Sequence, residues 1–408
     1  MATIKPFRAV RPVKDKVALV ASRSYEEYSE DELQCTLAHN PFSFLHIINP
    51  GFKYHKILAG EERFSLVKNR YWEFLEEKTF IKDQKPAFYL YQIKKDQFKT
   101  LGIFAATSVT DYDCGKIKKH EETLESRESL FAHYLETVGF NAEPVLITYE
   151  STKELEVLLN EQTNALPEYD FTTTDKVNHK LWPVYQADAI SKITSIFSQM
   201  DALYIADGHH RCASSSLLAK AAKLAGNDTM HHDFFMSYLI PEKEVKIYEF
   251  NRMVKDLNGL SKEEFLIRLD TNFRIEQKPN NGNKPKEKHH FSMYLDGEFY
   301  LLYLRKQAYT FTDALSRLDT QILYKTILEP VLGIKDLRND KRISYGYGKH
   351  NIIKMKDCID KGDFKVGFSL VPITMEEIKQ IADAGLVMPP KSTYIEPKLR
   401  SGLTIYEL

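Results

Sequence analysis

The stretch ALYIADGHHRCASSSLLAKAA, residues 202–222, constrains the fold of this chain more than any other. An apolar run ends at Asp207, Gly208 permits a sharp turn with positive φ, and a segment rich in Ala, Ser and Leu follows. This order predicts a strand, a tight turn and then a helix over 210–225, with Gly226 at the C-terminal cap.

The predicted turn has the chemistry of an anion site. The first N–H groups of a helix have no acceptor within the helix, and the helix dipole makes that end partly positive, so a phosphate is stabilised there. Arg211 adds a bidentate clamp, and His209 and His210 add directional donors. We therefore expect a phosphate cradle at this turn.

Two other interpretations of the turn remain open. Asp207 can be an ordinary helix N-cap, and the two histidines can be buried polar groups with satisfied hydrogen bonds. Metal binding by His209 and His210 is disfavoured, because adjacent side chains diverge in both helices and strands.

Composition narrows the classes of protein. The 408 residues contain 56 Lys and Arg against 57 Asp and Glu, a net charge of −1, which gives no electrostatic reason to expect nucleic acid or an anionic membrane as partner. The four cysteines form no CxxC pair, and no apolar run approaches a membrane span. We expect a soluble cytoplasmic protein that binds neither nucleic acid nor membrane.

Strand-like and helix-like segments alternate along the chain, which predicts a mixed α/β (α+β) fold. The expected strands are 88–93, 101–109, 144–150 and 202–207, with a hairpin over 290–305 that turns at Asp296-Gly297. The expected helices are 61–78, 121–138, 187–199, 210–225, 318–334 and 374–386, the last with a capping box. The expected regions are an N-terminal α+β region over 1–98, a central α/β region over 99–230 and a C-terminal α+β region over 231–408.

A second set of candidate residues lies in CGKIKKHEETLESRESL, residues 114–130. Three lysines lead into His120 and Glu121, which we place at a helix start. Acidic residues in a first turn are ordinary caps. In a functional interpretation, one glutamate is a general base, while the histidine and lysines hold phosphate oxygens.

The C-terminal segment 385–408 is the third candidate. Two prolines precede Lys391-Ser392-Thr393, and Lys398 and Arg400 follow. Such a segment either closes over an anion or is a solvated chain end.

Six blocks of this sequence resemble, in the same order, those of a widespread bacterial and archaeal family catalogued as a domain of unknown function. The blocks are IKPFRAVRP, NPFSFLHII, HEET, YIADGHHR, NRMV and MPPKSTYIEPKLRSGL.

The central blocks also resemble the ParB/sulfiredoxin superfamily, in particular its archaeal free-serine kinases. This resemblance implies a ParB/sulfiredoxin-like nucleotide-binding domain at 99–230. By this resemblance Glu121 is the catalytic base, and Gly208, His209, His210 and Arg211 form the phosphate-binding turn. From the residues themselves, we add His120 and Asp207 as catalytic candidates. Three further candidates for nucleotide or phosphate contacts are Thr123, Lys391 and Ser392.

The sequence departs from these families in two places. Residues 20–29, VASRSYEEYS, lack the Pro-Pro-Tyr-Asp usual in the larger family, which removes the expected basis for a substrate contact from that loop. Cys212 stands where an aromatic residue is common, and we interpret it as packing.

The resemblance implies a kinase that moves a phosphoryl group from ATP or ADP to free L-serine and gives O-phosphoserine, with Mg²⁺ bridging the nucleotide phosphates. The sequence sets neither the metal ligands nor the oligomeric state, and it is compatible with an oligomer. The alternative is a ParB-like nucleotide-binding switch without kinase activity. A metal-dependent hydrolase built on the histidines is disfavoured by their spacing.

Overall fold

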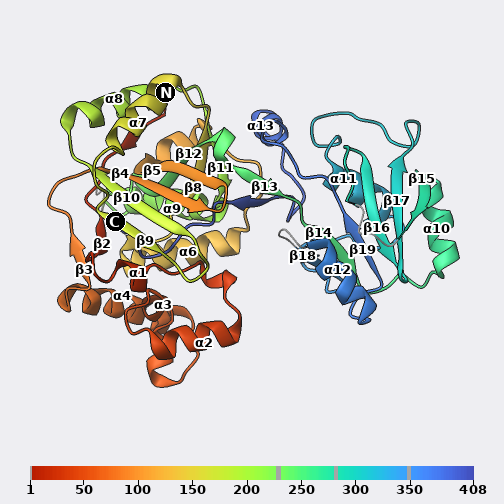
Figure 1. The fold of residues 1–408 in the computed structure, drawn as a ribbon, viewed down its shortest axis with the longest axis horizontal. Coiled ribbons are helices and arrows are strands. Elements are labelled where there is room, and N and C mark those ends of the chain that lie inside the picture. Colours follow the sequence, from red (N-terminus) through yellow and green to blue (C-terminus); the bar gives the residue numbers. More distant parts are fainter. Residues whose placement is uncertain (1, 227–230, 280–283, 347–350) are drawn as a thin grey trace. The chain divides into compact units, whose positions relative to one another are not determined.

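The computed structural model describes residues 2–226, 231–279, 284–346 and 351–408 (Figure 1). The chain splits into two compact units. Unit 1 comprises Met1–Lys119, Thr123–Val245 and Pro397–Leu408, and unit 2 comprises His120–Glu122 and Lys246–Glu396. The mixed α/β class predicted from the sequence is confirmed.

Unit 1 is built on a nine-stranded mixed sheet. The parallel pairs are β12 with β8 and β11 with β6, and the other neighbours are antiparallel. In spatial order the strands are β6 (Ile117–Lys118), β11 (Leu203–Asp207), β8 (Val145–Tyr149), β12 (Phe234–Pro241), β5 (Phe98–Ser108), β4 (Phe88–Lys95), β10 (Asn178–Val184) and β9 (Tyr169–Thr172), with β1 (Ile4–Lys5) also on β5. The four strands predicted in this region are confirmed.

The main core of unit 1 lies between this sheet and helices whose apolar residues recur at helical spacing. Leu155, Leu158 and Leu159 of α7 reach it, as do Ile193 and Phe197 of α8. The helices are α1 (Val17–Val20), α2 (Glu30–His39), α3 (Leu45–Ile48), α4 (Gly60–Glu76), α5 (Val109–Asp113), α6 (Glu125–Val138), α7 (Lys153–Gln162), α8 (Ala187–Ser198) and α9 (His209–Leu224).

Two short strand pairs complete unit 1. Strand β2 (Val10–Pro12) pairs with β3 (Phe80–Lys82), and β7 (Phe140–Asn141) pairs with β21 (Tyr406–Glu407) near the C-terminus. The last residues of the chain are therefore part of this unit.

Unit 2 contains a six-stranded antiparallel sheet. Neighbouring residues of its strands point to opposite faces, so Met253 and Val254 enter two different hydrophobic clusters. In spatial order the strands are β15 (Phe273–Lys278), β17 (Glu298–Leu304), β16 (His290–Leu295), β19 (Val366–Ser369), β14 (Asn251–Val254) and β18 (Ile343–Gly346), and β13 (Lys246–Tyr248) separately pairs with β20 (Tyr394–Glu396).

The helices in the described part of unit 2 are α10 (Lys262–Asp270), α11 (Asp319–Leu323), which continues as a π-helical turn over Tyr324–Leu328, α12 (Asn351–Asp360) and α13 (Met375–Asp383). Helices α10 and α11 contribute to the hydrophobic cluster on one face of the sheet of unit 2, and α12 contributes to the cluster on the other face. The predicted hairpin is confirmed: Asp296 and Gly297 have φ of 50° and 83°, as a two-residue turn of this type requires. The capping box of α13, from Thr374 to Glu377, is also present.

Two helix predictions need correction. The helix expected over 121–138 begins at Glu125, and residues 119–124 are non-helical. The helix expected over 318–334 is regular only to Leu323. Within the described ranges, no helix is both long and apolar enough to span a membrane.

Candidate functional site

The turn between β11 and α9 has the predicted geometry. Gly208 has φ of 101°, a conformation that L side chains rarely adopt, and the helix starts directly after it at His209. A Cβ atom at Gly208 would lie 3.2 Å from Cζ of Arg211 and 3.4 Å from Cα of Val145. The backbone conformation therefore favours glycine, and a Cβ atom at this position would press on the Arg211 side chain.

Asp207 lies between two cations at this turn. Its Oδ2 is 3.3 Å from Nζ of Lys398 and 3.6 Å from a terminal nitrogen of Arg211. Burial acts to raise the pKa of the Asp207 carboxyl, but Lys398 and Arg211 together hold it below its usual value. The carboxylate is thus ionised at neutral pH, and Lys398 and Arg211 balance its charge.

Arg211 is also anchored to the neighbouring strand of the sheet. Its guanidinium donates a hydrogen bond to the carbonyl of Pro144, just before β8. The N-cap of α9 is Gly208, which has no side chain of its own to cap the helix. The helix N-terminus, Arg211 and Lys398 each bring positive charge to this turn.

The two histidines of the turn have different environments. His209 is 5% exposed and belongs to the buried part of α9, whereas His210 is partly exposed. The carbonyl of His210 accepts a hydrogen bond from Ser214 Oγ at 2.6 Å. A ligand at the turn thus has easier access to the His210 side chain.

The C-terminal segment brings further charges to unit 1. Ser401 pairs with Ser22 through two backbone hydrogen bonds of 2.8 and 3.2 Å. Arg400, 9% exposed, donates to both oxygens of Asp175 at 2.7 and 2.9 Å. Sequence reasoning did not place Lys398 at Asp207, because 191 residues separate them and no local pattern records the contact.

Glu27 lies in the same charged region. Burial raises the pKa of its carboxyl, although Lys398, Arg400 and Arg23 act to lower it. The loop at 20–29 does not carry the family's usual residues. It nevertheless brings the Glu27 carboxyl and the Arg23 guanidinium toward the C-terminal segment. No sequence motif indicated this contribution.

His120, Glu121 and Glu122 form a non-helical segment, with a bend at Glu121, that groups with unit 2. The carbonyl of His120 accepts the Met388 N–H at 3.0 Å, and the carbonyl of Glu122 accepts an N–H of Arg338 at 3.0 Å. Because these carbonyls are bonded outside the segment, they cannot continue a helix, which explains the late start of α6. Two hydrogen bonds thus hold the backbone on either side of Glu121.

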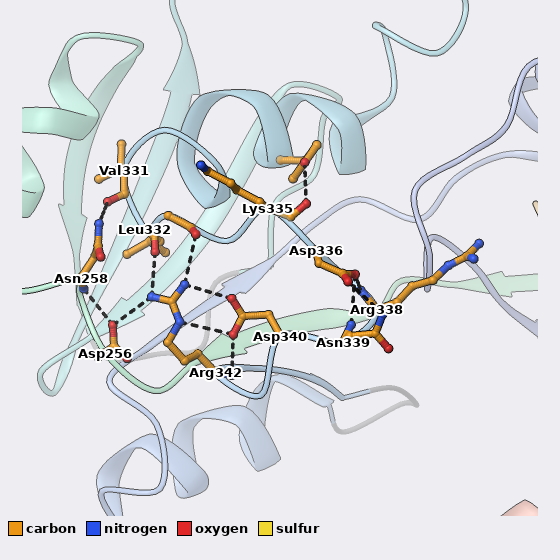
Figure 2. A network of polar contacts seen from close by, with 12 residues as sticks. Asp256, Asn258, Val331, Leu332, Lys335, Asp336, Arg338, Asn339, Asp340 and Arg342 are labelled. Carbon is orange, nitrogen blue, oxygen red and sulfur yellow. Dashed lines mark hydrogen bonds and ion pairs between the residues drawn. The ribbon is translucent and has the colours of Figure 1, made fainter.

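Arg338 belongs to a polar network in unit 2 (Figure 2). The Asp336 carboxylate accepts the backbone N–H groups of Arg338 and Asn339 at 2.9 and 3.1 Å, which fixes the turn that presents the arginine. Arg342 then ties this loop to the carbonyls of Leu332 and Gly333.

Thr123 and the C-terminal KSTY block have local roles in the structure. Thr123 Oγ1 donates to the Glu128 carboxylate just before α6, within unit 1. Ser392 is 5% exposed and its Oγ donates to the Pro389 carbonyl at 2.6 Å. Lys391 is exposed and has φ of 56°. Lys391 and Ser392 lie in unit 2, and the DGHHR turn lies in unit 1.

Among the residues that the structure describes, no group of three or more His, Cys, Asp or Glu side chains could hold a metal ion. Mg²⁺ in phosphoryl transfer is commonly held by one or two carboxylates, substrate phosphates and water. Asp207 is the acid at the turn, and it is already neutralised by Lys398 and Arg211. It therefore fits a positioning role better than that of a metal ligand.

Comparison with protein families identifies the chain's relatives. A family model described as "Protein of unknown function (DUF1015)" matches residues 4–321. The chain belongs to this family. The match includes the HEET and DGHHR blocks and ends before MPPKSTY. No curated protein matches the chain.

Several solved structures align with part of this chain at low sequence identity. A free serine kinase in complex with AMP is 14% identical, with a TM-score of 0.37, over 74% of this chain and 91% of that one. SbnI with a C-terminal truncation, from Staphylococcus aureus, is 14% identical, with a TM-score of 0.39, over 74% and 85%. A conserved hypothetical protein from Pyrococcus furiosus is 14% identical, with a TM-score of 0.35, over 73% and 91%.

Proposed function

We propose that this protein is a kinase that transfers a phosphoryl group from ATP or ADP to the hydroxyl of free L-serine. The observation that carries the proposal is the turn at the start of α9, where Arg211 and Lys398 face one carboxylate beside the N-terminus of a 16-residue helix. Such an arrangement stabilises the negative charge of a phosphate chain and of the phosphoryl group in transit. The resemblance of the HEET and DGHHR blocks to free-serine kinases supports L-serine as the acceptor.

In the proposed reaction, the Glu121 carboxylate takes the proton of the serine hydroxyl. The serine oxygen then forms a bond to the terminal phosphorus of the nucleotide, while the bond from that phosphorus to the bridging oxygen breaks. The products are O-phosphoserine and ADP from ATP, or AMP from ADP. Mg²⁺ would neutralise phosphate charge, and Arg211 and the helix amides would hold the oxygens.

Glu121 suits the role of base because its backbone is fixed on both sides. The hydrogen bonds to the His120 and Glu122 carbonyls restrict the segment, and a fixed base reduces the entropy cost of reaching the reactive geometry. Glu122, the next residue, has a side chain that is 72% exposed. It provides a matched control.

The test incubates the purified chain with Mg-ATP or Mg-ADP and a panel of hydroxy amino acids, and detects products by mass spectrometry. We expect phosphoserine from the wild type and from Glu122→Gln, and loss of product at unchanged nucleotide affinity in Glu121→Gln. Arg211→Ala should weaken nucleotide binding itself. Full activity of Glu121→Gln would refute the assignment of the base.

The competing function is a nucleotide-binding switch of the ParB type, which uses a similar turn without transferring phosphate to a small molecule. Tight nucleotide binding without any phosphorylated product from either donor would support the switch and refute the kinase.

A further inference from the structure

A buried arginine without an acidic partner lies in strand β14 of unit 2. Arg252 is 3% exposed, and its guanidinium donates to the carbonyls of Phe250 at 2.6 Å and Lys391 at 3.1 Å. These are its hydrogen bonds within the described ranges, and no carboxylate there pairs with it. Since a guanidinium has five N–H groups, three lack an acceptor in the described part of the chain.

This environment differs from that of two other arginines whose side chains are held by hydrogen bonds, Arg342 and Arg11. Arg342 also donates to two carbonyls, but Asp340 and Asp256 supply carboxylates at 3.0 and 3.5 Å (Figure 2). Arg11, 6% exposed, is paired with Asp83 at 2.9 Å. A buried charge is costly unless it is paired, so Arg252 lacks the element that balances the others.

The surroundings of Arg252 strengthen the case for an absent anion. Burial lowers the pKa of Arg252 to about 10, the direction expected for a cation that lacks a counter-charge. Its Cζ lies 5.7 Å from the ring centre of Tyr345. The ring of Phe250 packs edge-to-face against those of Tyr345 and Tyr394. Aromatic walls exclude water, and an ion pair beside them is stronger than in bulk solvent.

A second cation lies against the same group of aromatic rings. Nζ of Lys391 lies 5.7 Å from the ring centre of Phe250, and the Lys391 carbonyl is held by Arg252. Lys391 has no carboxylate partner in the described part of the chain, and its side chain is exposed. The two cations therefore share the same aromatic surroundings, one buried and one accessible to solvent.

We propose that Arg252 and Lys391 form a binding site for a small oxyanion, a carboxylate or a phosphate group. The planar arginine fork matches either group in bidentate fashion, and the lysine adds a point charge from the solvent side. All the residues named for this site lie in unit 2, so the site is distinct from the turn at Arg211. The proposal does not depend on the kinase function.

The test is equilibrium dialysis of the full chain with radiolabelled inorganic phosphate and, in a separate arm, radiolabelled acetate. It is made in the Arg211→Ala background, so that the turn in unit 1 does not contribute. We expect one saturable site, with the preferred anion showing which source of oxyanion it takes. Arg252→Gln should weaken binding by about tenfold or more, and Lys391→Gln by a smaller factor.

Two controls separate binding from folding. Arg274→Gln removes another arginine of unit 2 that lies over a tyrosine, with its Cζ 4.1 Å from the ring centre of Tyr303, and should leave binding unchanged. Lys391→Gln changes an exposed side chain, so it tests the site even if Arg252→Gln fails to fold. Absence of saturable binding of both anions, or equal affinity before and after Lys391→Gln, would overturn the proposal. Phosphoserine formation by the wild type is measured separately, and its result bears on the proposed kinase function but not on this oxyanion site.

Discussion

Replacing Asp319 with Asn should prevent the loss of unit 2 stability that we expect in the wild type as the pH rises. Asp319 begins α11, is fully buried, and accepts the His289 N–H at 2.8 Å through Oδ1. Its Oδ2 has no hydrogen-bond partner in the described part of the chain. Burial raises the pKa of this carboxyl from 3.8 to about 7.

The sign of the effect follows from proton linkage. Between pH 3.8 and about 7, the folded chain retains a proton that the unfolded chain releases. The contribution of Asp319 to the free energy of unfolding is therefore fully present below pH 3.8 and is lost as the pH rises through about 7. The whole loss is on the order of 4 kcal/mol, of which about 2.5 kcal/mol falls between pH 5 and pH 8.

The Asn variant keeps an oxygen acceptor for His289 and cannot ionise. Raising the pH from 5 to 8 should therefore shift the difference in opening free energy between variant and wild type by about 2.5 kcal/mol in favour of Asn. Hydrogen exchange by mass spectrometry on peptides from β16 and α11, corrected for intrinsic rates, measures this difference. Peptides from unit 1 provide an internal control.

An unchanged difference between the two pH values would refute the reasoning. It would mean that the buried carboxyl is compensated when ionised, for example by the nearby Lys288, which lowers its pKa.

Two further predictions concern the candidate site. Gly208→Ala should cost about 1–3 kcal/mol of unit 1 stability and weaken nucleotide binding, because it combines left-handed backbone with contact to Arg211. Gly226→Ala, with φ of 71° and open space around its Cβ position, should cost about 1–2 kcal/mol and leave binding unchanged. Urea denaturation followed by tryptophan fluorescence measures the stability of both variants, since Trp72 and Trp182 are in unit 1. An equal loss of nucleotide binding in the two variants would contradict the assignment of the turn at Gly208 as the binding site. Arg338→Ala should lower kcat about tenfold at unchanged nucleotide affinity, because it releases the Glu122 carbonyl beside the proposed base. Arg305→Ala, which breaks an exposed pair with Asp270, is the control, and an equal fall in kcat there would contradict a positioning role for Arg338.

Local features of the fold could be predicted from the sequence because short-range sterics decide them. The turn at Gly208, the hairpin at Asp296-Gly297 and the capping box at Thr374 each depend on a few consecutive residues. The alternation of strands and helices also gave the mixed α/β class. These features locate the proposed phosphate cradle in the sequence but do not identify all of its residues.

The rest of the site depends on contacts between distant residues. Lys398 reaches Asp207 because Ser401 pairs with Ser22, and no periodicity records that pairing. Residues 121–124 belong to a sequence that favours helix, yet hydrogen bonds from Met388 and Arg338 hold this region in a non-helical conformation. Tertiary hydrogen bonds here outweigh local propensity.

The placement of Pro397–Leu408 in unit 1 has a consequence for truncation experiments. A variant that lacks these residues loses strand β21, the backbone hydrogen bonds between Val10 and Ile405, and the contact of Lys398 with Asp207. Lys246–Glu396, which forms most of unit 2, contains none of the deleted residues. Such a deletion would therefore disrupt unit 1, to which the DGHHR turn belongs, and leave the strands and helices of Lys246–Glu396 complete.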